Sequence, residues 1–195
     1  MIYSQDDDLY YHSEYLPSYL FPQQENEQTR FSRTIWAFKN GDNGVISNFA
    51  RILASDVISL AAHKHIYSNE IALVAVPSSH ARTHSSVQRC IEEACDILQN
   101  SIHPKNYRDW SDCLIRESDI QTAHLAATGG RPTYTDQINS LSCSRNNISH
   151  YYLHIILVDD IYTTGTSIMA CRQILQNNGA YPEYIANYVF GKTVH

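Results

Sequence analysis

Cysteine is scarce in this chain, and its spacing argues against two common kinds of small fold. The 195 residues contain five cysteines, an odd number, and no two of them form a Cys-x-x-Cys pair. They are Cys90, Cys95, Cys113, Cys143 and Cys171. This pattern argues against a disulfide framework and against a four-cysteine zinc site. A reducing, cytoplasmic compartment is the simplest expectation.

Long apolar runs are also missing. No stretch approaches the roughly 18 apolar residues that a membrane span requires, and the first residues lack a basic segment followed by an apolar one, which a secretory signal would show. Hydrophobic residues make up 43% of the chain and charged residues 17%, which is typical of a globular protein. We therefore expect one well-buried domain, with at most an appendage, and no membrane association.

The ten histidines do not form a metal-binding pattern. The closest pairs, His63 with His65 and His80 with His84, have no cysteine or carboxylate at ligand spacing. We therefore expect no zinc site made by protein side chains alone.

Positive charge is absent from the first 28 residues, which carry six acids. The rest of the chain has equal numbers of acids and bases, so the net charge of −6 arises in this segment. The segment is also rich in tyrosine. We predict that residues 1–30 form an acidic arm or hood, and that residues 31–195 form the main domain. The arm is either solvated with its tyrosines packed on the core, or a cover or docking element. Because phosphate backbones require local positive charge, we expect no nucleic-acid partner.

Apolar periodicity alternates between strand and helix along the main domain. It predicts helices at 45–63, from 86 onward and at 167–178, and strands at 71–76, 112–116, 151–158 and 184–190. Strands separated by helices favour parallel pairing, and ligands then bind beyond the carboxyl ends of the strands. The predicted fold class is α/β, with a mainly parallel twisted sheet flanked by helices.

The most informative segment is Ile156–Ser167, with the sequence Ile-Leu-Val-Asp-Asp-Ile-Tyr-Thr-Thr-Gly-Thr-Ser. An apolar run leads to Asp159 and Asp160, then to a loop of hydroxyls with one glycine, and then to a helix. Unpaired amides at a helix start favour an anion such as phosphate, and carboxylates accept hydrogen bonds from sugar hydroxyls. No lysine lies near this loop, which argues against a Walker-type P-loop. The segment therefore predicts a sugar-phosphate site; the plainer alternative is a turn that Asp160 merely caps.

This segment resembles the phosphoribosyl-pyrophosphate (PRPP) motif of type I phosphoribosyltransferases. The resemblance implies a single-domain fold of that family, with a lid loop and an N-terminal hood. It also implies that Asp159 and Asp160 hold the ribose hydroxyls in a catalytic role. The 5′-phosphate ligands would be Thr163, Thr164, Gly165, Thr166 and Ser167.

A second loop, Ser78-Ser79-His80-Ala81-Arg82, follows the predicted strand at 71–76. In the family the corresponding loop binds pyrophosphate, and hydroxyls, backbone amides and a guanidinium suit that task. The resemblance implies that Ser78, Ser79, His80 and Arg82 bind pyrophosphate. An ordinary surface loop with a solvated Arg82 is the alternative.

The order of segments is similar to the ComF-like branch of the superfamily. Ile35–Gly41 is a near match to a segment of that branch, and Gln137, Leu141, Arg145 and Asn147 match a looser one. Two features of the branch are absent: its N-terminal four-cysteine module, and an Arg-Gly-Phe-Asn sequence after the pyrophosphate loop. A role in DNA uptake is therefore not carried over.

Residues 117–150 lie where the family has a mobile lid. Arg116, Arg131 and Arg145 are candidates to meet pyrophosphate, and Arg131 is preferred because Gly129 and Gly130 precede it. The implied activity is that of a glycosyltransferase (pentosyltransferase) which moves phosphoribosyl from PRPP to an unidentified acceptor. Mg²⁺ would be held through PRPP and possibly by Asp159 and Asp160, and a homodimer is the family habit. The alternatives are a PRPP-binding sensor or a non-catalytic interaction protein on the same fold.

Overall fold

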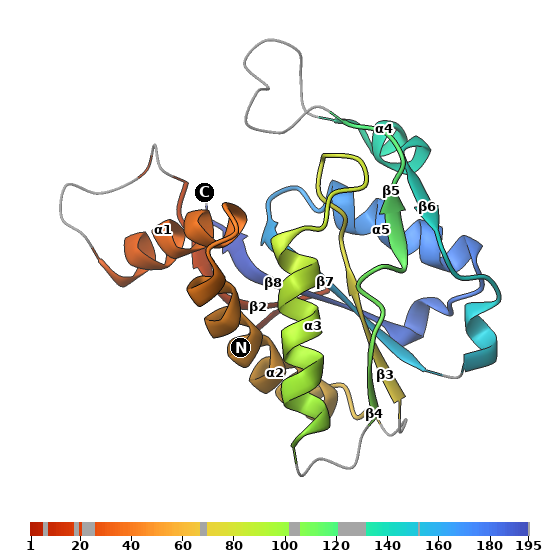
Figure 1. Ribbon diagram of the computed structural model, residues 1–195, viewed down its shortest axis with the longest axis horizontal. Helices are drawn as coiled ribbons and strands as arrows, with labels where there is room; N and C mark the ends of the chain where they lie inside the picture. The colour runs from red at the N-terminus through yellow and green to blue at the C-terminus, as the bar shows by residue number, and fades with distance from the viewer. Residues whose placement is uncertain are drawn as a thin grey trace.

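A six-stranded sheet forms the centre of the molecule in the computed structural model (Figure 1). The structure describes residues 1–5, 8–17, 20, 26–66, 70–101, 106–120, 132–151 and 153–194. In spatial order the strands are β1 (Ile2–Ser4), β2 (Leu9–Tyr15), β8 (Ile185–Thr193), β7 (His154–Tyr162), β3 (Glu70–Ala75) and β4 (Asn106–Asp109). The pair β1–β2 is antiparallel and the other neighbours are parallel. The predicted α/β class with a mainly parallel sheet is confirmed.

Helices flank this sheet, and a small hairpin lies beside it (Figure 1). The helices are α1 (Glu27–Lys39), α2 (Asn43–His63), α3 (Ser86–Gln99), α4 (Tyr134–Asn139) and α5 (Thr166–Asn177). The hairpin consists of the antiparallel strands β5 (Leu114–Arg116) and β6 (Leu141–Cys143). Two 3₁₀ turns, η3 (Ile148–Tyr151) and η4 (Pro182–Tyr184), complete the described elements.

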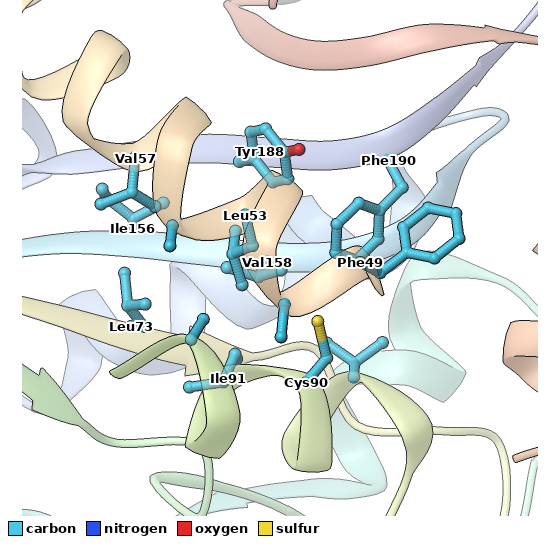
Figure 2. Close-up of a cluster of buried hydrophobic side chains, with 14 of the residues drawn as sticks. Phe49, Leu53, Val57, Leu73, Cys90, Ile91, Ile156, Val158, Tyr188 and Phe190 are labelled. Atoms are coloured by element: carbon cyan, nitrogen blue, oxygen red, sulfur yellow. The ribbon is translucent and has the colours of Figure 1, made fainter. Parts of the chain in front are cut away.

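The sheet is buried on both faces because side chains alternate along its central strands. In β7, Ile156 and Val158 join a cluster with side chains of α1, α2 and α3. Figure 2 shows this cluster, in which Phe49 and Leu53 of α2 and Ile91 of α3 lie over the sheet. On the other face, the intervening side chains of β7 pack with α5 and the hairpin. The fold therefore has three layers, and the carboxyl ends of its parallel strands share one edge.

The predicted helices at 45–63, from 86 onward and at 167–178 are confirmed as α2, α3 and α5. The strands predicted at 71–76 and 184–190 are confirmed as β3 and β8, and the one at 112–116 is confirmed in part as β5. The strand predicted to end at Val158 needs correction, because β7 continues to Tyr162. Pairing of Asp159 with Val189 and of Ile161 with Gly191 of β8 keeps this segment extended.

The first 30 residues contribute directly to the sheet. Strand β2 pairs in parallel with β8 along Leu9–Tyr15. Leu9, Tyr10 and Tyr15 are buried, which agrees with the expectation that tyrosines of this segment pack on the core. The division into an arm and a domain at residue 30 stays a prediction, and α1 crosses that boundary.

Among the helices that the structure describes, α2 is long and apolar enough to cross a membrane by length and composition alone. Half of its apolar window is buried inside the fold. The core helix of a soluble protein passes the same test, so this feature is weak evidence for a membrane span.

Candidate functional site

Two loops, far apart in sequence, meet at the carboxyl edge of the sheet. Strands β3 and β7 are parallel neighbours, with Ala75 opposite Val158. The Val76 amide donates a hydrogen bond of 2.8 Å to the Val158 carbonyl, just beyond the end of β3. The loop that begins at Pro77 and the acidic end of β7 therefore lie side by side. The ends of these two parallel strands therefore converge on one edge of the sheet.

Asp159 and Asp160 lie on the last part of β7, not in a turn beyond it. Successive side chains of a strand point to opposite faces, so the two carboxylates leave the strand in different directions. Asp160 meets Lys39 of α1, on the face covered by α1, α2 and α3. Asp159 lies on the α5 face, and its Oδ1 accepts a 2.8 Å hydrogen bond from the Asp160 amide.

The Asp159 carboxyl is electrostatically unfavourable as an anion. Burial, together with the neighbouring Asp160 charge, raises its pKa to about 8. The Asp160 amide and the cations Lys39 and Arg116 act in the opposite direction without cancelling that effect. A carboxyl with this pKa is mostly protonated near pH 7, and any additional donor or cation brought near it would favour its ionised form.

Lys39 is the nearest basic partner of the acidic pair. Its Nζ lies 3.2 Å from Oδ2 of Asp160, and the lysine and aspartate side chains are 35% and 22% exposed. Burial disfavours the ammonium charge, but Asp160 and Asp159 outweigh this and raise the pKa of Lys39. The sequence interpretation included Lys39 only as part of the Ile35–Gly41 resemblance and assigned it no role. The sequence does hold one indication of the helix that carries Lys39. Ile35 and Phe38 are both apolar, lie three residues apart as on one face of a helix, and are buried.

The loop 163–167 has the backbone that its glycine suggests. Gly165 has φ +74, in the left-handed region that favours glycine. A Cβ at this position would lie 2.6 Å from the hydroxyl oxygen of Tyr162, so the tyrosine ring covers the glycine closely. Thr163 and Thr164 are exposed, and the Thr164 and Thr166 hydroxyls are 2.9 Å apart.

Helix α5 begins without a side-chain cap. Gly165 is its N-cap residue and makes no such hydrogen bond, whereas α1, α2, α3 and α4 are capped by the side chains of Asn26, Asp42, Ser85 and Thr133. The first amides of α5 thus have no acceptor from a capping side chain. Free amides and the positive end of the helix dipole make such a start suitable for an anion.

The loop 78–82 is held by acids of the segment that follows β5. Asp119 accepts a 2.6 Å hydrogen bond from the Ala81 amide and lies 3.8 Å from Nδ1 of His80. Glu117 lies 3.4 Å from the Arg82 guanidinium, whose side chain is 78% exposed. Arg82 itself has φ +52. Carboxylates therefore occupy groups that the sequence interpretation assigned to pyrophosphate.

Arg116 was a candidate pyrophosphate ligand, but it is buried and hydrogen-bonded inside the protein. Its guanidinium donates to the Ser78 carbonyl at 3.0 Å, to Gln137 Oε1 at 2.9 Å and to the Ser140 hydroxyl. Gln137 then donates to the Ser167 hydroxyl at 3.1 Å. Arg116 and Gln137 therefore connect the loop after β3 to the first turn of α5.

The other two candidate arginines also differ from expectation or lie outside what is described. Arg145 pairs with Asp112 at 3.2 Å and lies 4.6 Å from the centre of the Trp110 ring, so it serves the hairpin region. Arg131 lies outside the described residues, as does the central part of the segment predicted as a lid.

An open cleft of about 470 Å³ lies on the hairpin side of the 78–84 loop. Its lining includes Arg82, His84, Asp112, Glu117 and Ser144. The acids of β7 and the loop 163–167 do not line it. Pro77, His80 and Arg82 also line this cleft, so it adjoins the candidate loop 78–82 but not the acidic end of β7 or the loop 163–167.

Within the residues that the structure describes, no group of three or more His, Cys, Asp or Glu side chains is placed to hold a metal ion. Asp159 and Asp160 supply two carboxylates. Carboxylate oxygens suit Mg²⁺, which usually takes few protein ligands and completes its shell with water and substrate phosphates. The raised pKa of Asp159 also fits a place where a cation would relieve repulsion.

Comparison with known proteins adds no relative. A scan of the sequence against models of protein families finds no match, and a search of curated proteins finds none either. The case for a function therefore depends on the residues and their geometry.

Proposed function

We propose that this protein is a PRPP-dependent phosphoribosyltransferase of the type I, ComF-like kind. It would transfer the phosphoribosyl group to a nitrogen nucleophile and release pyrophosphate. One observation carries the proposal: a diacid, Asp159-Asp160, leads directly into a glycine-containing hydroxyl loop at an uncapped helix start. This combination suits a ligand with a diol at one end and a phosphate at the other.

The 5′-phosphate would bind at the start of α5. Gly165 permits the left-handed turn that directs the backbone amides toward an anion. The hydroxyls of Thr163, Thr164, Thr166 and Ser167 surround the same turn. Ser167 is already oriented by Gln137, so less ordering is needed when phosphate binds.

The ribose diol would be held by the acids of β7. Asp160 faces α1 beside Lys39, while Asp159 lies deeper and carries the raised pKa. A carboxyl that is mostly protonated at neutral pH can donate as well as accept a hydrogen bond. Such a carboxyl suits a ribose hydroxyl, which is itself both donor and acceptor.

Pyrophosphate would bind at the loop 78–82. Asp119 and Glu117 now interact with the Ala81 amide and with Arg82. Because the Ala81 amide and the Arg82 guanidinium already interact with carboxylates, they can also bind other oxygen anions. Pyrophosphate would replace both carboxylates, and like-charge repulsion would drive Asp119 and Glu117 away from it.

In the proposed reaction, opposite charges develop at two parts of the substrate. As the bond between the anomeric carbon and pyrophosphate breaks, the ribose becomes more positive and the leaving group more negative. Asp160 next to the ribose stabilises the developing positive charge, and the Arg82 guanidinium stabilises the leaving group. A bound Mg²⁺ supplies further positive charge to the pyrophosphate oxygens. Anchoring of the remote 5′-phosphate orients the reacting carbon.

Pyrophosphate release from PRPP in the presence of Mg²⁺, with a panel of purine, pyrimidine and simple amine acceptors, tests the proposal. We expect release with at least one acceptor, and loss of release in the Asp159→Asn, Asp160→Asn double variant. The double variant Glu93→Gln, Asp96→Asn likewise replaces two carboxyls of α3 by amides, away from the site, and should retain activity.

Calorimetry with PRPP separates the enzyme from the alternatives. Binding without turnover for any acceptor would favour a sensor on the same fold. Absence of PRPP binding by the folded protein would remove the basis of the proposal altogether.

A further inference from the structure

Two cysteines meet at the open end of the small hairpin, outside the site described above. Cys113 immediately precedes β5, and Cys143 is the last residue of β6. Their Sγ atoms are 3.6 Å apart. The Ser144 amide donates a 2.8 Å hydrogen bond to the Cys113 carbonyl, which holds the two segments together. The sulfurs need to approach by only about 1.5 Å to reach disulfide bonding distance.

The two thiols differ in access. Cys113 is fully buried, whereas Cys143 is partly exposed. A reagent from solution can therefore reach Cys143 first, and Cys113 lies directly behind it. This is the arrangement of an attacking thiol with a resolving thiol beside it.

The electrostatic surroundings favour the same assignment. A hydrogen bond from the Cys113 thiol, aided by the positive charge of Arg145, lowers the pKa of Cys143 to about 7. The same hydrogen bond and burial raise the pKa of Cys113. Since the thiolate is the nucleophile, a cysteine with a pKa near 7 reacts readily at neutral pH.

The remaining cysteines provide an internal contrast. Cys90, Cys95 and Cys171 are buried in the core, and burial raises the pKa of each, that of Cys95 to about 12. Within the part of the chain that the structure describes, none of these three thiols has another sulfur as a hydrogen-bond partner. Buried thiols of this kind are inert toward oxidants in solution.

We propose that Cys113 and Cys143 are a redox-active dithiol that is oxidised to a disulfide by small-molecule disulfides. The Cys143 thiolate attacks one sulfur of the reagent, whose S–S bond breaks and releases one thiol. The Cys113 sulfur then attacks the Cys143 sulfur of the mixed disulfide and releases the second thiol. The two cysteine protons end on the two released thiols, and the reagent is reduced as the protein pair is oxidised.

The cross-link would affect the region between the two cysteines. The ring from 113 to 143 contains Arg116 and Gln137, which connect the loop after β3 to the start of α5. Closing the ring restricts the unfolded chain and so stabilises this connection. The proposal concerns thiol chemistry alone and does not depend on the phosphoribosyltransferase proposal.

Treatment of the native full-length protein with oxidised glutathione at neutral pH tests this inference. Alkylation under denaturing conditions, followed by peptide mapping, should then find three free cysteines and a Cys113–Cys143 link. The link should raise Tm, and dithiothreitol should reverse both changes. Cys143 should be alkylated at a lower pH than an unperturbed cysteine, because its thiolate is favoured.

Single variants distinguish the two roles. Cys113→Ala should accumulate a stable mixed disulfide on Cys143, and Cys143→Ser should acquire neither adduct nor link. Cys95→Ala is the matched control and should still form the link. The wild-type protein alone can overturn the proposal. It would do so if it kept five free thiols, carried only a mixed disulfide, or linked a different pair of cysteines.

Discussion

Lys39 Nζ at the end of α1 lies 3.2 Å from Oδ2 of Asp160 near the end of β7. This ion pair joins the first long helix to the acidic motif more than a hundred residues later. It also places a positive charge beside two adjacent carboxylates, one of which already has a raised pKa. Lys39 therefore helps both acids to coexist at the edge of the sheet.

Replacement of Lys39 by Met should destabilise the protein most at alkaline pH. The carboxylates then repel each other without a nearby ammonium, so we expect a loss of about 1 kcal/mol at pH 8, in the range of a partly exposed ion pair. The loss should be smaller at pH 5, where Asp159 is protonated in both proteins and only the Lys39–Asp160 pair is lost. Urea unfolding at both pH values measures it. Lys39→Arg keeps the charge and should lose less; equal losses in both variants would show that packing, not charge, matters here.

The pH dependence of stability tests the environment of Asp159. Its pKa in the folded state is about 8, whereas an unperturbed aspartate has a pKa of about 4. Between these values the folded protein holds a proton that the unfolded chain has released, so stability falls as pH rises through this window. Asp159→Asn cannot lose a proton there. We expect its stability relative to the wild type to increase steadily from about pH 4 to pH 8.

Thermal unfolding at pH 5, 6, 7 and 8 measures this difference. Asp96→Asn, on the exposed side of α3, is the control and should follow the wild-type curve. A parallel offset between Asp159→Asn and the wild type at all four pH values would contradict the raised pKa.

Much of the fold was accessible from sequence because the central elements carry strong local patterns. Ile71–Val76 is a continuous apolar run, and the structure makes it a strand buried on both faces. The motif from Ile156 to Ser167 likewise predicted a strand, an acidic turn and a helix start; the strand and the helix start are confirmed, whereas the two acids lie on the strand itself. Secondary structure could be predicted for these segments because their patterns are local in the sequence.

The features that were missed depend on distant partners. Leu9–Tyr15 lies in an acidic segment, and its strand forms because β8, near the other end of the chain, pairs with it. Asp159 and Asp160 stay extended for the same reason. Arg116 was expected to be solvated or to bind substrate, since arginines are rarely buried without partners. Its acceptors come from two segments far apart in sequence: Ser78 from the loop after β3, and Gln137 and Ser140 from α4 and its C-cap.

Arg116 should therefore be important for stability. Arg116→Met leaves the Ser78 carbonyl and the Gln137 amide oxygen without their donor, and unsatisfied buried polar groups cost about 1–3 kcal/mol each. We expect a total loss of about 3 kcal/mol in urea unfolding. Arg116→Lys restores one donor and should lie between this variant and the wild type. Arg51→Met, on the exposed side of α2, should change stability little; a similarly small change for Arg116→Met would mean that the hydrogen bonds contribute no net stability.

Gly165 allows the strain of the hydroxyl loop to be separated from its steric crowding. Gly165→Ala places a residue with a Cβ at φ +74 and brings that Cβ within 2.6 Å of the Tyr162 hydroxyl oxygen. The left-handed conformation alone costs about 1 kcal/mol for a residue with a side chain, and the contact adds to it. Tyr162→Ala removes the contact but not the conformational strain. Gly165→Ala should therefore reduce the free energy of unfolding less in the Tyr162→Ala background than in the wild type. It should still reduce it, because the conformational strain remains.

The free energy of unfolding of the two single variants and the double variant gives this coupling as a cycle. Gly44→Ala is the matched control, because Gly44 lies in the first turn of α2 without a positive φ and its nearest neighbour would be 3.4 Å from the new Cβ. It should be neutral or slightly stabilising. If alanine at 165 were as well tolerated as alanine at 44, the backbone of the loop would have to differ from the turn described above. The same loop would then lose the amide arrangement on which phosphate binding is proposed to depend.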